Sequence, residues 1–120
     1  MSTRNQVIGR WGEDAAVEYL AANGYMIMAR NVHCVHGEID IIASKEDLLI
    51  FVEVKTRRSH TFAYPEDSVT RRKQAYMLSA AEEYLQAHPE SGENWQFDVI
   101  AVEGTPGKEA QIEHFENVIT

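Results

Sequence analysis

The sequence has only one cysteine, Cys34, and no apolar run long enough to cross a membrane. A single cysteine cannot form a disulfide within the chain, which fits a reducing compartment. A spanning helix needs about 20 consecutive apolar residues, and the charged opening MSTRNQVIGRWGEDAA lacks the apolar segment of a signal peptide. We therefore expect a cytoplasmic protein without a membrane partner.

Glycine-rich phosphate loops, internal repeats and low-complexity segments are also missing. The first absence argues against nucleotide-driven chemistry. The other two, together with a length of 120 residues, predict a single domain over residues 1–120.

Basic residues are scarce, because 11 Lys and Arg face 19 Asp and Glu and the formal net charge is −8. This balance argues against a protein that coats nucleic acid nonspecifically, since phosphate neutralisation dominates that kind of affinity. Six of the basic residues nevertheless fall between Lys55 and Lys73. The acidic chain therefore has one basic zone that can make local contacts with DNA.

The hydrophobic pattern predicts an α/β sandwich in the order αβββαβ(β), with a mixed sheet flanked by helices. Helices are predicted over residues 5–23 and 68–88, the second one capped by the end of the 60–68 loop and stopped by Pro89. Strands are predicted over residues 25–32, 37–44, 48–57, 95–103 and, at an edge, 111–118.

Each helix has an apolar stripe at three- and four-residue spacing. In the first helix the stripe comprises Ile8, Trp11, Ala15, Ala16, Tyr19 and Ala22. Glu13 lies off that stripe, beside Val17 and Leu20 on a second, partly apolar side. In the second helix the stripe comprises Tyr76, Met77, Ala80, Ala81 and Tyr84.

The segment HGEIDIIASKEDLLIFVEVKTRR, residues 36–58, places charges inside two apolar strands. Side chains two positions apart share a face of a strand, so Glu53 lies beside Lys55 and Glu38 lies beside Asp40. The polar stretch SKED predicts a hairpin loop with an even number of residues. An even loop puts Asp40 on the face of Glu53 and within side-chain reach, whereas an odd loop would put it on the opposite face.

Two neighbouring carboxylates repel each other unless a cation lies between them. A hard divalent ion such as Mg²⁺ suits Asp40 and Glu53, and the backbone carbonyl of Val54 offers a further oxygen ligand. A metal, a bound water and Lys55 together suit in-line attack on a phosphodiester. We expect Glu38 to be either a secondary metal ligand or a residue that contacts the metal ligands. The alternative is a structural cluster of charges at the end of a strand.

The segments GRWGEDAAVEYL, GEIDIIA and IFVEVKTR resemble the YraN-like bacterial family, whose members resemble the PD-(D/E)xK nuclease superfamily and especially archaeal Holliday-junction resolvases. The resemblance extends from Gly9 through the strand WQFDVIAV. It implies a restriction-endonuclease-like fold and a Mg²⁺- or Mn²⁺-dependent endonuclease that acts on DNA, including branched or damaged DNA. It also implies that Asp40, Glu53 and Lys55 are the motif residues and that Glu13 reaches the same metal. The alternative for Glu13 is a solvated helix charge.

Two positions depart from the superfamily pattern. Ile39 stands where proline often precedes the motif aspartate, and Gln74 is followed four residues later by Leu78 where some relatives have tyrosine. Gln74 is therefore a secondary candidate for orienting the site. Lys73 falls on the apolar stripe of the second helix, where it reaches toward the cleft and a phosphate or simply extends its charge into solvent.

The basic zone supplies the candidates for gripping the DNA backbone, which are Arg57, Arg58, Arg71 and Arg72. Phe62 and Tyr64 lie between these arginines and could stack on bases or pack at the rim. Each of these residues has an ordinary surface role as its alternative. The His–Cys–Val–His stretch at residues 33–36 does not predict zinc, because no second His/Cys pair has matching spacing.

A noncatalytic module that binds nucleic acid or protein is the alternative to an enzyme. The acidic charge, the incomplete glutamine motif and the short chain all allow it. A chain of this size has little surface for a DNA junction, so we expect an active form to need a homodimer or a partner protein.

Overall fold

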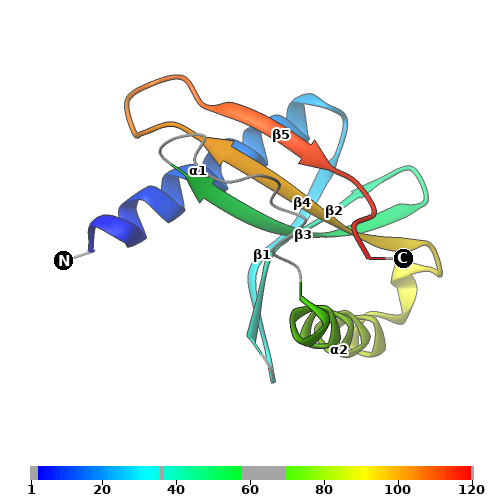
Figure 1. The fold of residues 1–120 in the computed structure, drawn as a ribbon. Helices are drawn as coiled ribbons and strands as arrows, with labels where there is room; N and C mark the ends of the chain where they lie inside the picture. The colour runs from blue at the N-terminus through cyan, green and yellow to red at the C-terminus, as the bar shows by residue number, and fades with distance from the viewer. Residues whose placement is uncertain (1–2, 36, 58–69, 120) are drawn as a thin grey trace.

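The computed structural model describes residues 3–35, 37–57 and 70–119. Along the chain, the elements are α1(Arg4–Ala22), β1(Met26–Cys34), β2(Gly37–Lys45), β3(Leu48–Arg57), α2(Arg71–Ala87), the short 3-10 helix η2(Pro89–Ser91), β4(Trp95–Glu103) and β5(Gln111–Phe115). The α1 helix begins at a capping box, in which Thr3 and Gln6 each accept a hydrogen bond from the other's backbone N–H. Figure 1 shows this arrangement.

The five strands form one sheet in the order β1-β2-β3-β4-β5. Three neighbouring pairs are antiparallel, and β3 and β4 are parallel because α2 lies between them in the chain. The predicted α/β sandwich with a mixed sheet is therefore confirmed, and so is the order of its elements.

The β2–β3 hairpin has the predicted parity. Its turn consists of Glu46 and Asp47 alone, two residues rather than the four of SKED, and Glu46 has a φ of 54°. Paired residue numbers sum to an odd value, as in Ile42↔Phe51. An even loop of two residues preserves the same faces as an even loop of four.

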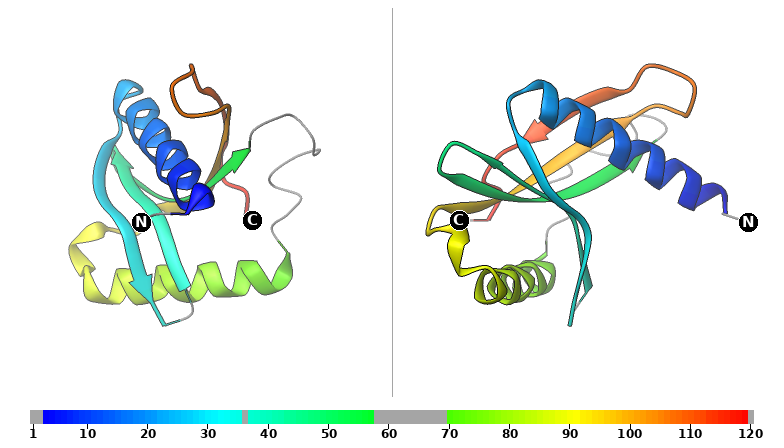
Figure 2. Two further views of the ribbon diagram at one scale, coloured as in Figure 1. Left: turned by 90° about the vertical axis from the view of Figure 1, so that its left-hand side faces the viewer. Right: turned by 180° about the vertical axis from the view of Figure 1, so that it is seen from behind.

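The two helices cover opposite faces of the sheet (Figure 2). The α1 face buries Ala16, Leu20, Ile41, Ala43, Ile50, Val52, Ile100 and Val102. The α2 face buries Ile39, Ile42, Leu49, Phe51, Ala80, Ala81, Tyr84 and Phe97. Most neighbouring residues along β2, β3 and β4 thus point to opposite faces and enter different clusters. The sheet is therefore apolar on both faces, so any charged side chain within it needs an explanation.

Most of the predicted stripe of α1 lies on its packed side, because Ala16 is buried and Trp11, Ala15 and Tyr19 pack against the same cluster. The prediction fails at the end of the helix, where Leu20 is fully buried and Ala22 is exposed. Among the apolar residues of α1, the most deeply buried are Ala16 and Leu20. Glu13 precedes these two residues by three and seven positions, which places it on the packed side of the helix. The sheet packs against the side of α1 that carries the larger aliphatic residue, Leu20 rather than Ala22.

Two boundaries also differ from prediction. Thr70 caps α2 by accepting a hydrogen bond from the backbone N–H of Lys73, so the helix begins at Arg71, whereas the predicted start lies outside the described residues. Tyr76 is 40% exposed, so it leaves the predicted stripe. The edge strand β5 ends at Phe115, and the tail returns so that Val118 N–H donates to the carbonyl of Phe97.

Within the described ranges, no helix is both long and apolar enough to cross a membrane.

Candidate active site

The site begins where β2 and β3 stop pairing. The recorded ladder ends at Ile41↔Val52, one position before Asp40. Asp40 Oδ2 accepts a hydrogen bond of 2.8 Å from the backbone N–H of Val54. The Asp40 side chain thus takes the place of a strand partner, and this contact fixes its carboxylate against β3.

Asp40 and Glu53 line the same cavity of about 180 Å³ on the α2 side of the sheet. Glu38 and Lys73 add charge to the cavity wall. The other lining residues are Gly37, Ile39, Phe51, Val52, Tyr76, Met77, Ala80 and Phe97. The structure therefore brings together the two acids that the hairpin parity placed on one face.

One carboxylate oxygen of Glu53 lies close to two lysine ammonium groups, and the other lies close to neither of them. Its Oε1 lies 3.4 Å from Lys55 Nζ and is in contact with Lys73 Nζ. Its Oε2 is buried and has no hydrogen-bond partner among the described residues. A buried carboxylate oxygen without a partner is costly, so it indicates a ligand or a water at this point.

Burial shifts the ionisation of the surrounding groups. Burial raises the pKa of Asp40 to about 6 against the effect of the Val54 N–H, and the negative charges of Glu53, Glu13 and Glu38 raise it further. Burial and the adjacent Lys73 ammonium lower the pKa of Lys55. Burial acts against the charge of Lys73 as well, but its contact with Glu53 raises the Lys73 pKa overall.

The donor set fits a divalent cation. Asp40 and Glu53 line one cavity with two carboxylates, and Oε2 of Glu53 has no hydrogen-bond partner among the described residues. Mg²⁺ and Mn²⁺ prefer such hard oxygen ligands. Val54 is seen here through its N–H, which orients Asp40. The participation of its carbonyl stays a prediction.

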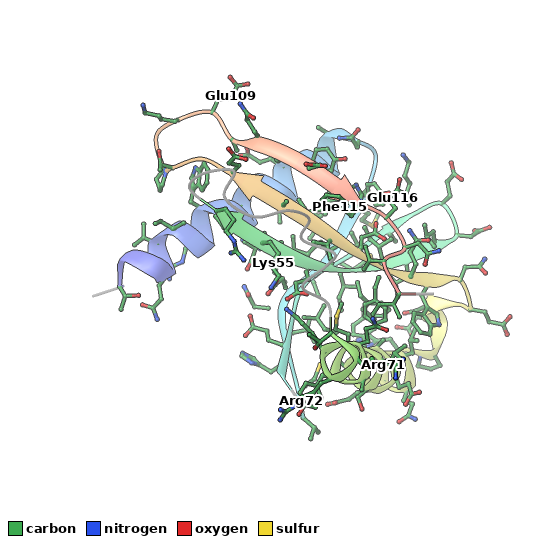
Figure 3. The ribbon with its side chains drawn as sticks, viewed as in Figure 1. Lys55, Arg71, Arg72, Glu109, Phe115 and Glu116 are labelled. Atoms are coloured by element: carbon green, nitrogen blue, oxygen red, sulfur yellow. The ribbon has the colours of Figure 1, made fainter. Side chains whose placement is uncertain are left out.

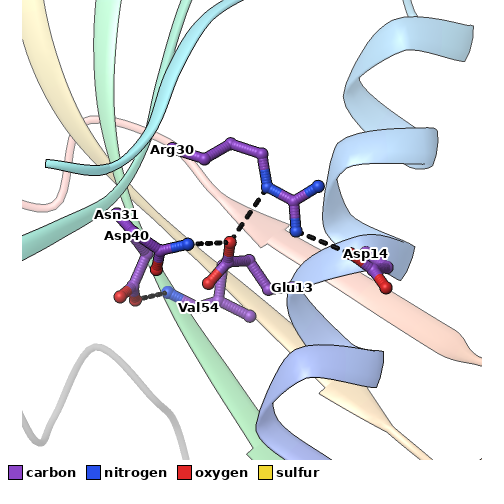
Figure 4. A network of polar contacts seen from close by, with 6 residues as sticks. All are labelled: Glu13, Asp14, Arg30, Asn31, Asp40 and Val54. Atoms are coloured by element: carbon purple, nitrogen blue, oxygen red, sulfur yellow. Dashed lines mark hydrogen bonds and ion pairs between the residues drawn. The ribbon is translucent and has the colours of Figure 1, made fainter.

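Glu13 lies close to this cluster but already has partners (Figure 4). Its Oε1 accepts hydrogen bonds of 3.0 Å from Arg30 Nε and 3.0 Å from Asn31 Nδ2. Arg30 also pairs with Asp14 at 2.6 Å. Together with Glu38, these residues border an open depression. Glu13 is therefore not a solvated charge, since its side chain is only 13% exposed, and its role toward a metal stays a prediction.

Residues 12–102 match the sequence profile of the uncharacterised protein family UPF0102. The chain belongs to this family. It is 42% identical over 113 residues to the UPF0102 protein of Syntrophomonas wolfei, covering 94% of this chain and 97% of that protein. It is 44% identical over 115 residues to the UPF0102 protein of Syntrophotalea carbinolica, covering 96% and 93%. The predicted family is confirmed.

A more distant similarity links this UPF0102 chain to the solved structure of Pyrococcus furiosus SfsA in complex with Ca²⁺. The TM-score is 0.42 and the sequence identity is 13%. The match covers 93% of this chain and 63% of the SfsA chain, so this chain spans less than two thirds of that protein.

The predicted DNA-contacting arginines within the described residues lie on two elements. Figure 3 shows two of them, Arg71 and Arg72, on α2. Arg57 ends β3, whereas Arg71 and Arg72 begin α2, and all three are exposed. Arg72 Nε donates to the hydroxyl of Tyr76 at 3.0 Å. Gln74 follows on the same helix and is half-buried. The predictions for Arg58, Phe62 and Tyr64 fall outside the described residues.

The stretch at residues 33–36 shows no zinc-like grouping in its described part. His33 Nδ1 lies 3.6 Å from Glu38 Oε2 and is 85% exposed. Cys34 is half-buried, and burial raises the pKa of its thiol. His36 is outside the described residues. His33 belongs to β1, where it pairs with Glu38 of β2.

A second polar cluster, on the α1 face, was missed by the sequence analysis. Asp98 is fully buried, and its Oδ2 lies 2.7 Å from Nε2 of His114 on β5. The His114 ring also meets the Tyr19 hydroxyl at 3.1 Å through Nδ1. The position of Asp98 among apolar residues of WQFDVIAV was the signal available in the sequence, but its partner lies 16 residues away on another strand.

The ligand atoms of Asp98, His114 and Glu116 lie within 4.8 Å of one another, a spacing that could hold a metal ion. However, Asp98 Oδ1 also accepts hydrogen bonds from Gln96 Nε2 and from the N–H of Asn117, both at 3.0 Å. Both oxygens of Asp98 are therefore engaged by the protein itself. These contacts account for the burial of Asp98 and tie β4 to β5, α1 and the tail.

Proposed function

We propose that this UPF0102 protein is a metal-dependent nuclease that hydrolyses phosphodiester bonds in DNA, with branched or damaged DNA as its substrate. One observation carries the proposal. Asp40 and Glu53 line one cavity, and one oxygen of these acids, Glu53 Oε2, is buried without a partner among the described residues. A lysine adjoins the same carboxylate, so acids and a cation meet at one point, as phosphodiester hydrolysis requires.

Each residue then has a definite task. Asp40 and Glu53 would hold Mg²⁺ or Mn²⁺, with Glu13 and the Val54 carbonyl as further oxygen donors. When bound, such a metal polarises a phosphoryl oxygen and lowers the pKa of a water molecule. The N–H of Val54 keeps Asp40 aimed at the cavity, because it fixes one of the two carboxylate oxygens.

The cations of the site act on the phosphate. Lys55 stabilises negative charge that develops on the phosphoryl group or positions the attacking water. Arg57 and Arg71 are exposed at the ends of two elements and would hold the DNA backbone. Because the chain is short, a homodimer or a partner protein would supply the remaining surface for a junction.

Cleavage in Mn²⁺ tests this proposal. The purified protein is incubated with labelled four-way-junction DNA and with linear duplex DNA. We expect cutting by the wild type and a loss of about 100-fold or more in Asp40→Ala and Lys55→Ala, because each removes a group on which the transition state depends. The control variants Glu109→Ala and Lys108→Ala remove one carboxylate and one ammonium in the turn before β5 and should cut normally. Equal cutting by all variants would identify a contaminant and contradict the proposal.

A noncatalytic DNA-binding module is the second candidate, and one observation favours it. The charge of Glu53 is already balanced within the protein by Lys55 and Lys73, so the cluster persists without a metal. Binding of the junction DNA without cleavage, in Mg²⁺ and in Mn²⁺, would select this function over the enzyme.

A further inference from the structure

Lys73 neutralises the same carboxylate whose other oxygen, Oε2 of Glu53, has no partner among the described residues. Its Nζ contacts Glu53 Oε1, although Lys73 comes from α2 and Glu53 from β3. The same side chain lines the cavity that Asp40 and Glu53 share. The aliphatic stem of Lys73 can pack along the apolar side of α2, and its ammonium meets the charge of Glu53 there.

Charge balance shows what this contact does. Asp40, Glu53 and Glu38 line the cavity with three negative charges, and Lys55 and Lys73 bring two positive charges to Glu53, so these five groups carry one net negative charge. A divalent ion added to this set would leave one excess positive charge in a partly buried cavity. Excess charge in such a place is costly. One ammonium must therefore leave the carboxylates when a metal enters.

The geometry selects Lys73 as the group that leaves. Lys55 follows Glu53 by two residues on the same strand, so the backbone of β3 holds it beside the carboxylate. Lys73 is more exposed, at 32% against 19% for Lys55, and its long stem lets the ammonium reach solvent without moving α2.

We propose that Lys73 is a built-in counter-ion that competes with the divalent metal for Glu53. In the metal-free protein it neutralises the acids, and metal loading displaces it. This inference rests on the metal site of the proposed function. Its consequence is a weakened metal affinity in the wild type: if Lys73 leaves Glu53 in about one molecule in ten, the apparent affinity is about tenfold weaker than the intrinsic one.

The test is Mn²⁺ binding by isothermal titration calorimetry, without DNA and without an activity readout. The variant Lys73→Met keeps an unbranched apolar side chain and removes the charge. We expect it to bind Mn²⁺ about tenfold more tightly than the wild type. Lys73→Arg retains a cation and should stay near the wild-type affinity. Lys108→Met makes the same change in net charge within the exposed turn between β4 and β5, and its affinity should stay within about twofold of the wild type.

The outcomes separate this inference from the proposed function. Tighter binding by Lys73→Met alone supports the competition, including the case in which only this variant binds measurably. Equal or weaker binding by Lys73→Met, with a binding wild type, overturns the inference and leaves the metal site intact. No Mn²⁺ binding by either protein overturns both.

A folding defect in Lys73→Met would show in far-UV circular dichroism, and the question then passes to a measurement on the wild type. The side-chain ¹⁵Nζ resonance of Lys73 is followed during titration with diamagnetic Mg²⁺. We expect it to move from the value of a paired ammonium to that of a solvated one. A resonance that stays constant while Mg²⁺ binds would contradict displacement.

Discussion

At the scale of single residues, the surroundings of Asp40 in the candidate site oppose the ionisation of its carboxyl group. Burial raises the pKa of Asp40 to about 6, and three neighbouring carboxylates contribute to the rise. An aspartate in an unfolded chain ionises near 3.8, so the folded state binds the proton more tightly. The extra stability is fully present below the unfolded pKa and is lost as the pH rises through about 6. At neutral pH the ionised Asp40 therefore opposes folding.

Asp40→Asn should consequently stabilise the metal-free protein at pH 7.5. The amide keeps an oxygen for the Val54 N–H and removes the charge. We expect an increase of about 1–3 kcal/mol in the free energy of unfolding, which follows from a shift of up to two pKa units. The measurement is urea unfolding in EDTA, and the difference between variant and wild type should shrink as the pH falls from 7 toward 4.

A matched control for this prediction is Asp47→Asn in the exposed β2–β3 turn, which should change stability by less than about 0.5 kcal/mol at both pH values. If Asp40→Asn were less stable than the wild type at pH 7.5, the ionised carboxylate would be gaining more from Lys73 and Lys55 than it loses by burial.

At the scale of elements, alternation along strands was sufficient to place the two acids. Side chains of a strand alternate in any sequence, so an even turn fixed the common face of Asp40 and Glu53 even though the turn has two residues and not four. Helix faces were less predictable. Both sides of α1 carry apolar residues, and the choice of Leu20 over Ala22 depended on the sheet beneath them.

The close approach of α1 to β3 predicts that two glycine-to-alanine substitutions in this helix change the stability of the protein in opposite directions. A Cβ on Gly12 would lie 2.0 Å from Oγ1 of Thr56, whereas a Cβ on Gly9 would meet nothing within 4 Å. We expect Gly12→Ala to destabilise the protein by about 1–3 kcal/mol, because the helix must move away from the sheet. We expect Gly9→Ala to stabilise it by about 0.5–1 kcal/mol, because alanine favours a helix.

Thermal or urea unfolding measures both changes, and the double variant Gly12→Ala/Thr56→Ala should recover part of the loss. Recovery would be incomplete, since the Thr56 Cβ itself would stay 2.9 Å from the new methyl group. Equal effects of the two glycine substitutions would show that α1 does not approach β3 so closely.

At the scale of the whole molecule, contacts between side chains of distant segments could not be predicted from the sequence. The motif, the order of the elements along the chain and the family could be inferred from local patterns and a resemblance. The partners of Asp98 could not, because His114 and Tyr19 come from another strand and from the first helix. The contact of Lys73 with Glu53 likewise required the packing of α2 on the sheet, although a lysine on an apolar stripe marked the position.

The overall charge of −8 sets a limit on how this molecule can bind DNA. A few local cations must supply the attraction, because the rest of the surface repels phosphates. If Arg57, Arg71 and Arg72 each contact one phosphate, log K should fall with log salt with a slope of about −3, and Arg71→Gln should reduce the steepness by about 0.9. Fluorescence anisotropy of a labelled four-way junction in EDTA measures this without cleavage. Lys108→Gln removes an equal charge from the turn before β5 and should leave the slope unchanged. A slope that Arg71→Gln does not alter would exclude Arg71 from the DNA interface, and an equal loss in both variants would mean that only net charge matters.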